Sequence, residues 1–252
     1  MTKATATNIL PRLKLLDAQK GRSQRNEVLS SCIQDYFSEN DDTINILEAG
    51  CGRKWSLDLN RIKYKLTGID IDKNALELRK TTERDLDKAI LGDLRYVEFD
   101  REEFDIIYCV TVIEHIDGTE EVIDNFFKWL KPGGLLILVF PDRDSIFGFI
   151  TRLTPHWFHV FVYRHIYKKT NAGKLGFPPF PTYYNKIVSR RAIHDYCKDN
   201  GHNVVLEYGR PFNFRKLGRL ALGTIALFKV MHYLSFKKFT ANHADLICVI
   251  QK

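Results

Sequence analysis

The sequence has no closely spaced pairs of cysteines. The five cysteines stand singly at positions 32, 51, 109, 197 and 248 of the 252 residues, without the short repeated spacings of a disulfide scaffold or a zinc ribbon. Glycine and proline are also few, with 15 and 8 residues, whereas 12% of the residues are aromatic. These proportions exclude a low-complexity or disordered chain. With 44% apolar and 27% charged residues, the composition fits one globular domain, alone or with a cap.

Long apolar runs are absent as well. The longest uninterrupted run of apolar or small residues is Leu220 to Phe228, far short of the roughly 20 residues needed to cross a bilayer. The first residues, MTKATATNILPRLKLL, have neither the continuous apolar core nor the small-residue cleavage site of a secretory signal. These absences predict a cytoplasmic protein with reduced thiols and without a transmembrane helix.

Acidic residues are scarce in the second part of the chain. Residues 1–141 contain 20 Lys and Arg and 25 Asp and Glu, a net charge of −5, whereas residues 142–252 contain 18 and 6, a net charge of +12. The second part is also rich in aromatic residues. We therefore expect its basic surface to serve a different purpose from the acidic first part.

Short apolar runs alternate with amphipathic segments through most of the chain. Thr43 to Glu48 predicts a buried strand that enters a tight turn, and Thr119 to Leu130 predicts a helix with one apolar face. The strands expected in this way are residues 43–48, 65–70, 89–91, 104–110, 135–140, 203–208 and 244–250, the helices are residues 73–88, 119–130 and 189–201, and residues 131–134 are a turn. This alternation is typical of an α/β fold whose mostly parallel sheet is covered on both faces.

Two stretches interrupt the alternation in the C-terminal half. Residues 142–186 are aromatic and basic, and residues 210–240 have an apolar middle between basic clusters. We expect residues 1–42 to form an N-terminal helical segment and residues 43–252 to form the α/β domain, with both interruptions inserted in it as a cap. No internal repeat is visible in the sequence.

Polar residues follow the first three expected strands. The first strand runs into Glu48-Ala49-Gly50-Cys51-Gly52, the second ends at Asp70, and the third is followed by Asp93. Ligands of parallel sheets bind at the carboxyl ends of strands, where glycines allow close approach to the backbone and carboxylates can accept hydrogen bonds from a ribose diol or an amine. Each residue alone also fits a tight turn or a helix cap. Their order and spacing together favour a nucleotide-like ligand.

These strand ends resemble those of the class I S-adenosylmethionine-dependent methyltransferases, in particular the small-molecule type that includes the ubiquinone-biosynthesis O-methyltransferases. The motifs are ILEAGCG (46–52), GIDID (68–72), LGD (91–93), FDIIYCVTVIEHI (104–116) and LKPGGLLILVFP (130–141). The resemblance implies a Rossmann-like, doubly wound, mostly parallel seven-stranded sheet with an antiparallel last strand. It also implies that the chain uses S-adenosyl-L-methionine as its cofactor and transfers a methyl group.

The resemblance carries the family's cofactor contacts over to this sequence. In the family, the acid and glycines after the first strand bind the methionine part of the cofactor, the second acid the ribose hydroxyls, and the third acid the adenine amine. The residues implied here are Glu48, Gly50, Gly52, Asp70, Ile71, Asp93, Leu94 and Val110. The usual third glycine is absent, because Arg53 and Lys54 stand there; this pair can hold the cofactor carboxylate or be solvated. The absence also weakens the alternative of a nicotinamide dehydrogenase, which depends on G-x-G-x-x-G.

Catalytic candidates come from two segments. Glu114-His115 follows the fourth strand, where His115 can act as a general base or orient the nucleophile, or belong to a structural turn. His156 and His159 are further candidate bases in the first interruption, although the aromatic residues around them can equally pack a cap onto the sheet. Ubiquinone-type relatives place a Glu three residues before the Glu-His pair and are thought to hold a metal there. Thr111 occupies that position in this chain, so we predict no metal ligand.

The second interruption suggests a surface role. Residues 215–238 predict a basic amphipathic helix, which can lie at an anionic membrane surface or pack as a lid. Its apolar content argues against a nucleic-acid partner. We predict a cytoplasmic methyltransferase that can bind the membrane periphery and that methylates a small, lipophilic acceptor at oxygen. The alternative from another class is a non-catalytic S-adenosylmethionine-binding scaffold or sensor, and RNA or DNA methylation is less favoured.

Overall fold

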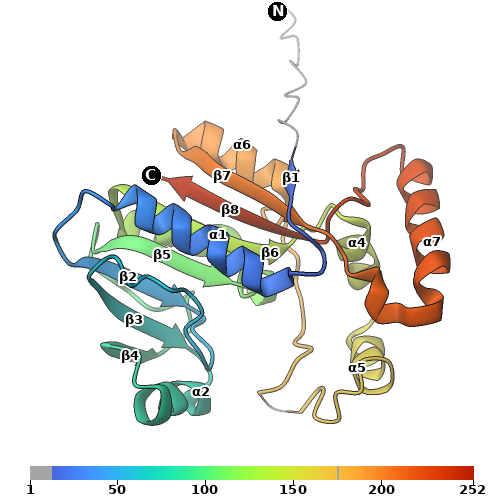
Figure 1. Ribbon diagram of the computed structural model, residues 1–252, viewed down its shortest axis with the longest axis horizontal. Coiled ribbons are helices and arrows are strands. Elements are labelled where there is room, and N and C mark those ends of the chain that lie inside the picture. Colours follow the sequence, from blue (N-terminus) through green and yellow to red (C-terminus); the bar gives the residue numbers. More distant parts are fainter. Residues whose placement is uncertain (1–12, 175) are drawn as a thin grey trace, which may run out of the picture.

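The computed structural model describes residues 13–174 and 176–252, and its centre is one eight-stranded sheet (Figure 1). The strands are β1 (Lys14–Leu15), β2 (Ile44–Ala49), β3 (Tyr64–Asp70), β4 (Lys88–Leu91), β5 (Phe104–Val110), β6 (Leu130–Pro141), β7 (Asn203–Arg210) and β8 (Asp245–Gln251). Their order across the sheet is β1-β7-β8-β6-β5-β2-β3-β4. β8 is antiparallel to both of its neighbours, and the other neighbouring strands are parallel. The prediction of a mostly parallel α/β sheet with an antiparallel last strand is confirmed.

Helices cover both faces of the sheet. They are α1 (Gly21–Tyr36), α2 (Lys73–Leu78), α3 (Thr119–Trp129), α4 (Ile146–Leu153), α5 (His156–His165), α6 (Arg190–Asn200) and α7 (Ala221–Leu234). Leu29 and Ile33 of α1 pack into the core cluster on one face, and Phe126 of α3 and Ile193 of α6 pack into the cluster on the other. The sheet is therefore buried between two helical layers, as continuous apolar strands require. All five cysteines are free thiols.

The sheet has one strand more than the predicted seven. Lys14 and Leu15 pair in parallel with Tyr208 and Gly209 at the edge of the sheet. Two residues are too short to produce an alternating pattern, which explains why the sequence did not indicate this strand. The predicted segment 1–42 otherwise contains α1, and residues 1–12, where most of the stretch considered for a secretory signal lies, are outside the described residues.

Three local predictions were wrong. The helix expected over 215–238 is divided, because a 3-10 helix, Phe214–Leu220, with Gly218 at a φ of 55°, precedes α7. The helix expected over 73–88 stops earlier, because α2 continues only as a π-helical turn, Arg79–Glu83, and Arg84 then takes a left-handed conformation with φ of 52°. The turn expected at residues 131–134 lies inside β6 as an irregularity in the ladder, between the pairs Phe104–Leu130 and Ile106–Leu135. All three predictions missed departures from regular helix or strand geometry, which residue composition describes poorly.

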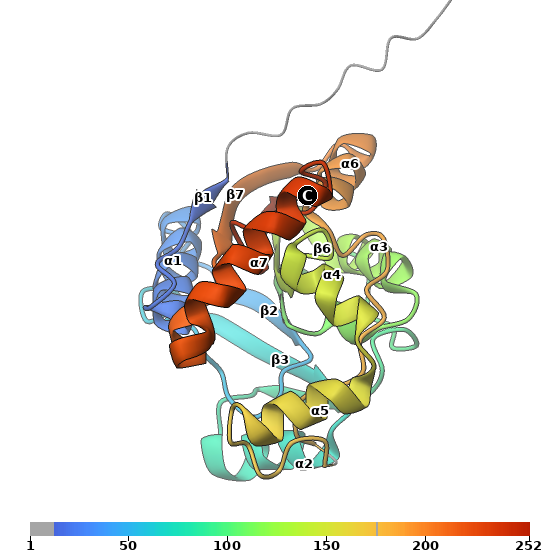
Figure 2. The ribbon, with the colours of Figure 1, turned by 90° about the vertical axis from the view of Figure 1, so that its right-hand side faces the viewer.

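The two insertions lie together at the carboxyl ends of the parallel strands. Figures 1 and 2 show α4, α5 and α7 on this side of the sheet. Ser145, the N-cap of α4, forms an isolated β-bridge with Thr240, and the ring of Phe149 stacks on Phe239 with centroids 4.4 Å apart. The insertions are therefore packed against each other. Within the described ranges, no helix is long and apolar enough to cross a membrane.

Candidate functional site

The glycine turn after β2 is the first part of the site. Gly50 and Gly52 have φ of +69° and +55°, in the left-handed region that disfavours other residues. A Cβ on Gly50 would lie 2.2 Å from the side chain of Val112, so the turn after β2 packs directly on the loop after β5. A Cβ on Gly52 would meet nothing within 4 Å. The backbone at Gly52 is therefore open to a ligand, whereas Gly50 is needed for close packing.

Asp70, at the end of β3, joins the loops after β2 and β3. One carboxylate oxygen accepts the N–H of Gly52 at 2.7 Å, and the other accepts the N–H of Asp72 at 2.8 Å. The helix that follows is capped by Asp72, whose Oδ1 accepts the N–H groups of Asn74 and Ala75. The alternative in which Asp70 caps this helix is therefore excluded. Asp70 instead lies half-buried beside the open Gly52.

Glu48 forms a buried ion pair with Arg79. Its Oε2 lies 2.8 Å from Nη2 of Arg79, a fully buried guanidinium that also donates to the Cys51 carbonyl at 2.8 Å and to Asp85 at 2.6 Å. Burial raises the pKa of the Glu48 carboxyl, whereas the charge and hydrogen bond of Arg79 oppose this rise. Arg79 thus ties the end of β2 and the glycine turn to the π-helical turn after α2.

The remaining predicted cofactor residues differ in exposure. Asp93 accepts hydrogen bonds from the Arg95 guanidinium, the shortest at 2.6 Å, and this hydrogen bonding lowers the pKa of the Asp93 carboxyl. Ile71 is 75% exposed beside Asp70, although it is apolar. The Leu94 side chain is buried in the core, and Val110 at the end of β5 is half-buried. The predicted residues that remain accessible at this edge therefore include Ile71, the partly exposed Asp93 carboxylate and the Gly52 backbone.

Thr111 begins the loop after β5 in a strained conformation. Its φ is +54°, which for a β-branched residue costs on the order of 1–3 kcal/mol. Its N–H donates to the Val139 carbonyl and its hydroxyl to the Val110 carbonyl, both at 2.7 Å. Strain of this kind concentrates at functional sites.

Over residues 13–174 and 176–252, no group of three or more His, Cys, Asp and Glu side chains is arranged to hold a metal ion.

Glu114 and His115 follow in the same loop. Nδ1 of His115 lies 2.6 Å from the carbonyl oxygen of Pro181. Because a carbonyl only accepts, Nδ1 carries the hydrogen and Nε2 keeps its lone pair. Burial lowers the pKa of His115, so the imidazole is neutral near pH 7. Glu114 is buried with its Oε1 3.7 Å from Nε2, and burial raises its pKa to about 8. His115 Nε2 is therefore equipped to accept a proton.

Comparison with known proteins gives the family of the chain. A family model described as a methyltransferase domain matches residues 22–207. The chain belongs to this methyltransferase family. The predicted resemblance to the class I S-adenosylmethionine-dependent methyltransferases is confirmed, and S-adenosylmethionine is the cofactor of that class.

The curated relatives match only part of the methyltransferase. The mitochondrial ubiquinone biosynthesis O-methyltransferase of Saccharomyces cerevisiae is 30% identical over 116 residues, which are 43% of this chain and 37% of that protein. The ubiquinone biosynthesis O-methyltransferase of Rickettsia akari is 26% identical over 125 residues, 48% of this chain and 49% of that protein. The chain thus aligns with less than half of the length of these two relatives.

Solved structures match over nearly the whole chain. A putative sarcosine dimethylglycine methyltransferase from Galdieria sulphuraria has a TM-score of 0.59 and 12% identity, with 93% of this chain and 87% of that chain covered. Magnesium protoporphyrin IX methyltransferase from Synechocystis, solved with bound SAH, has a TM-score of 0.54 and 15% identity, with 94% and 85% covered. At these identities the likeness is one of fold.

The first insertion crosses the carboxyl edge of the methyltransferase sheet. Phe177 lies under the guanidinium of Arg53, with 5.5 Å between the guanidinium carbon and the ring centroid. Pro181 receives the His115 hydrogen bond, and the N–H of Tyr183 donates to the Glu114 carbonyl at 2.9 Å. Arg53, which replaces the third glycine, therefore contacts the insertion. The segment 176–184 connects the glycine turn with the loop that carries His115.

The other two candidate bases lie in α5. Nε2 of His159 is 2.6 Å from the Thr154 hydroxyl, and the rings of His156 and His159 have centroids 6.4 Å apart. Burial lowers the pKa of His159, and the neighbouring His156 adds to this effect. The described contacts of these two histidines join them to each other and to the preceding turn. They do not join either histidine to His115, Asp70 or the glycine turn.

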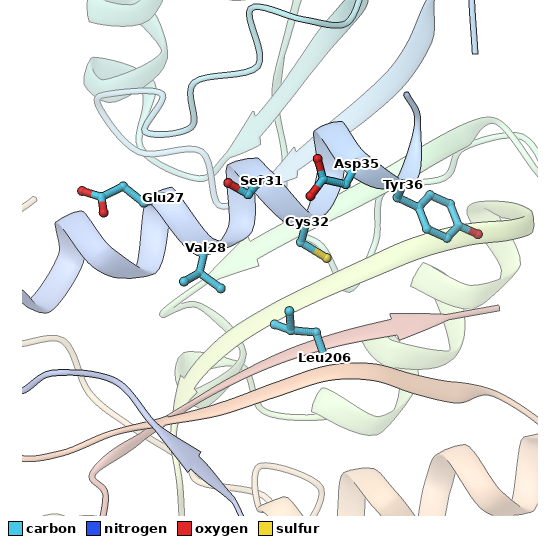
Figure 3. A pocket seen from close by; sticks show the side chains of 7 residues that line it. All are labelled: Glu27, Val28, Ser31, Cys32, Asp35, Tyr36 and Leu206. Atoms are coloured by element: carbon cyan, nitrogen blue, oxygen red, sulfur yellow. The ribbon is translucent and has the colours of Figure 1, made fainter. Parts of the chain in front are cut away.

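A pocket of about 570 Å³ lies elsewhere, between α1 and β7 (Figure 3). Its lining includes Val28, Cys32 and Tyr36 of α1 and Leu206 of β7. β8, β6 and β5 separate β7 from β2 in the sheet. This pocket therefore contains none of the predicted site residues and is distinct from the carboxyl edge that carries them.

Sequence reasoning missed Arg79 and Pro181. Arg79 falls within the predicted helix 73–88, where a single arginine gives no sign of being buried. Pro181 acts through its backbone carbonyl, which carries no residue-specific signal. Both become part of the site through contacts with Glu48 and His115, which lie 31 and 66 residues away in the chain.

Proposed function

We propose that this methyltransferase transfers the methyl group of S-adenosylmethionine to a hydroxyl oxygen of a small, lipophilic acceptor. The observation that carries the proposal is the neutral His115 imidazole, whose Nε2 keeps its lone pair in a loop packed on the glycine turn. The cofactor's sulfonium supplies an electrophilic methyl group. The protein then has to align the acceptor, exclude water and remove the hydroxyl proton. His115 Nε2 is suited to the last task.

The carboxyl edge fits the cofactor in its polar and apolar groups. The open Gly52 backbone can accommodate the methionine part, and the half-buried Asp70 can accept hydrogen bonds from the ribose hydroxyls. The exposed Ile71 can pack on the flat adenine, and Asp93 can receive the adenine amine while it keeps its contact with Arg95. Glu48 holds Arg79 with one oxygen, so its other oxygen is the one proposed to meet the methionine part.

The exposed surface of the insertions supports a lipophilic acceptor. Of the large apolar side chains exposed in the described part of the chain, eight lie in residues 142–186 and six in residues 210–240, against six in the rest. α5 has no buried residue, and Phe228 is the buried residue of α7. Apolar patches of this extent mark surfaces that bind other apolar matter.

The same surface supports binding to an anionic membrane. Exposed apolar residues of α7 include Leu222, Leu227 and Leu234, and the exposed cations Arg219, Lys229, Lys237 and Lys238 lie along and beside the helix. Each cation near an anionic surface contributes about 1 kcal/mol. We propose that α7 lies in the interface between membrane and water. The acceptor would then pass from the bilayer to the carboxyl edge of the sheet.

Flotation with vesicles tests the membrane part of the proposal. The full chain should co-float with phosphatidylcholine vesicles containing 30% phosphatidylserine at low salt and detach at about 0.5 M salt, where charges are screened within a few Å. The double variant Leu222→Ser, Leu227→Ser should lose flotation. Val205→Ser, which changes an exposed residue of β7, is the matched control. If the double variant floats as well as this control, α7 does not lie in the membrane interface.

Transfer of label tests the reaction itself. The protein is incubated with methyl-labelled S-adenosylmethionine and a cell extract, and the label is partitioned between organic, aqueous and protein fractions. We expect label in the organic fraction. Mass spectrometry of the labelled product should show that the new methyl group is bound to oxygen. Calorimetry with Asp70→Asn should show weakened cofactor binding. Label confined to the aqueous or protein fraction would reject the lipophilic acceptor.

Two other functions give different outcomes. A non-catalytic scaffold would bind S-adenosylmethionine without transfer to any fraction, and the orientation of His115 Nε2 counts against it. A nucleic-acid methyltransferase would place label in RNA or DNA; the apolar exposure of α7 counts against this function, because surfaces that follow phosphates are polar.

A further inference from the structure

Two arginines beside the proposed acceptor site lack partners for part of their guanidinium groups. Arg143 follows β6, and Arg152 lies in the last turn of α4, with its Nη2 donating to the Arg143 carbonyl at 3.2 Å. The Nε atoms of both side chains are buried without a hydrogen-bond partner. In the part of the chain that the structure describes, neither guanidinium forms an ion pair with a carboxylate.

The acids that the structure describes nearby form no close ion pair with either arginine. Asp142 is already bound, because its Oδ2 accepts from His243 Nε2 at 2.8 Å and its Oδ1 accepts the N–H of Asp144. Burial and the neighbouring Asp142 raise the pKa of Asp144, although Arg143 and Arg152 oppose this rise. Burial and the proximity of Arg143 lower the pKa of Arg152. Two half-buried guanidinium groups therefore lie together, each with an unpaired Nε and neither in an ion pair with a described carboxylate.

The pair lies near the loop that carries His115. β5 and β6 are neighbouring strands, paired as far as Val110 with Val139, and Arg143 and His115 each follow the carboxyl end of one of them. Tyr184 connects the two places: its N–H approaches the Glu114 carbonyl at 3.5 Å, and its phenol is close enough to Arg152 for the guanidinium to oppose the rise that burial causes in the pKa of the phenol. A group bound at the arginines would thus be held on the acceptor side of the carboxyl edge.

We propose that Arg143 and Arg152 bind an oxyanion, a carboxylate or phosphate, carried by the acceptor. The inference rests on the proposed function, since it names the class of acceptor: an amphipathic molecule with an acidic group, an apolar part and a hydroxyl. Guanidinium groups present parallel N–H donors that match carboxylate and phosphate oxygens. An oxyanion would place negative charge beside two guanidinium groups that form no ion pair with the described residues. The apolar part would then lie on the exposed side chains of the insertions.

Arginine Nε–H signals in nitrogen-proton correlation spectra test the site directly. The full chain, saturated with S-adenosylhomocysteine, is titrated with inorganic phosphate and separately with benzoate, at constant ionic strength kept with chloride. We expect saturable shifts of the Arg143 and Arg152 Nε–H signals with at least one probe. The probe that binds more tightly distinguishes a phosphate from a carboxylate. Shifts that stay linear with concentration for both probes would overturn the site.

Variants separate binding from folding. Arg143→Gln and Arg152→Gln should each weaken binding of the favoured probe by about tenfold or more, the range for a hydrogen bond to a charged group. If a glutamine variant fails to fold, Arg152→Lys takes its place. This variant keeps the charge and should bind the probe with intermediate strength. Arg101→Gln, at an exposed position before β5, is the control. Unchanged probe binding in the Arg143 and Arg152 variants would reject the assignment.

Failure of this inference is distinguishable from failure of the proposed function. The glutamine variants should bind S-adenosylmethionine as the original chain does, because neither arginine lies among the proposed cofactor contacts. Loss of oxyanion binding with intact cofactor binding concerns the acceptor site alone. If no oxyanion binds but label still reaches an organic product, the methyltransferase acts on an uncharged acceptor and only the present inference is rejected.

Discussion

Nδ1 of His115 lies 2.6 Å from the backbone carbonyl oxygen of Pro181, 66 residues further along the chain. This hydrogen bond joins the loop after β5 to the first insertion and selects the tautomer in which Nε2 can accept a proton. The insertion therefore does more than cover the edge of the sheet. It sets the orientation of the residue best suited to act as the base.

Replacement of this histidine should affect turnover rather than cofactor binding. In His115→Gln, the loss of a positioned base is expected to lower kcat by about 10²- to 10⁴-fold, while calorimetry shows unchanged S-adenosylmethionine affinity. His202→Gln changes a ring that stacks on Phe127 of α3; it is the control and should keep its activity. Equal activity of the two variants would mean that another group accepts the proton, with His156 and His159 as the next candidates.

The pH dependence of kcat/KM should report the same residue. Burial lowers the pKa of His115, so the neutral form persists below the value of about 6.5 of a free histidine, and the acid limb of the profile should lie below that pH. The unfolded chain binds this proton more readily than the folded chain does. His115 therefore lowers the free energy of unfolding as the pH falls through the same range. Glu114, whose pKa burial raises to about 8, would give a separate limb that Glu114→Gln removes. An acid limb below pH 6.5 that persists unchanged in His115→Gln would contradict the assignment.

The two glycines of the turn should respond differently to alanine. Gly50→Ala places a Cβ 2.2 Å from Val112 and should strongly destabilise the fold, by roughly 2–4 kcal/mol from overpacking and backbone strain. Gly52→Ala meets open space, so its cost to stability should be confined to about 1–2 kcal/mol of backbone strain. Its Cβ would instead occupy space proposed for the cofactor. Urea unfolding should therefore show the larger loss of stability in Gly50→Ala. Calorimetry should show the larger loss of cofactor affinity in Gly52→Ala.

Arg79 should matter for stability more than any exposed ion pair. Arg79→Gln leaves Glu48 buried without its cation and removes the donor to the Cys51 carbonyl. We expect the free energy of unfolding to fall by about 3–5 kcal/mol, the range for breaking a buried ion pair. Asp35→Asn, which removes the exposed pair with Arg61, should cost less than about 1 kcal/mol. Similar urea midpoints for both variants would show that the buried pair contributes little.

Most of the sheet could be predicted from local sequence alone. The predicted strand 104–110 coincides with β5, and α6 lies within the predicted helix 189–201, where the Ser189 hydroxyl caps it by accepting the Ala192 N–H. Such elements can be read because a buried parallel strand needs a continuous apolar run and a helix start needs a side-chain acceptor. The two-residue β1 and the π-helical end of α2 carry too few residues for any such pattern.

The sequence by itself determined which polar residues stand at the strand ends, since the position of Gly52, Asp70, Asp93 and His115 after their strands follows from strand length. Only the tertiary structure decided what these residues contact. Asp70 binds the Gly52 amide, Arg79 takes one oxygen of Glu48, and Pro181 orients His115. These contacts join residues 18 to 66 positions apart. They depend on how sheet, turn and insertion pack together, and no local periodicity records that packing.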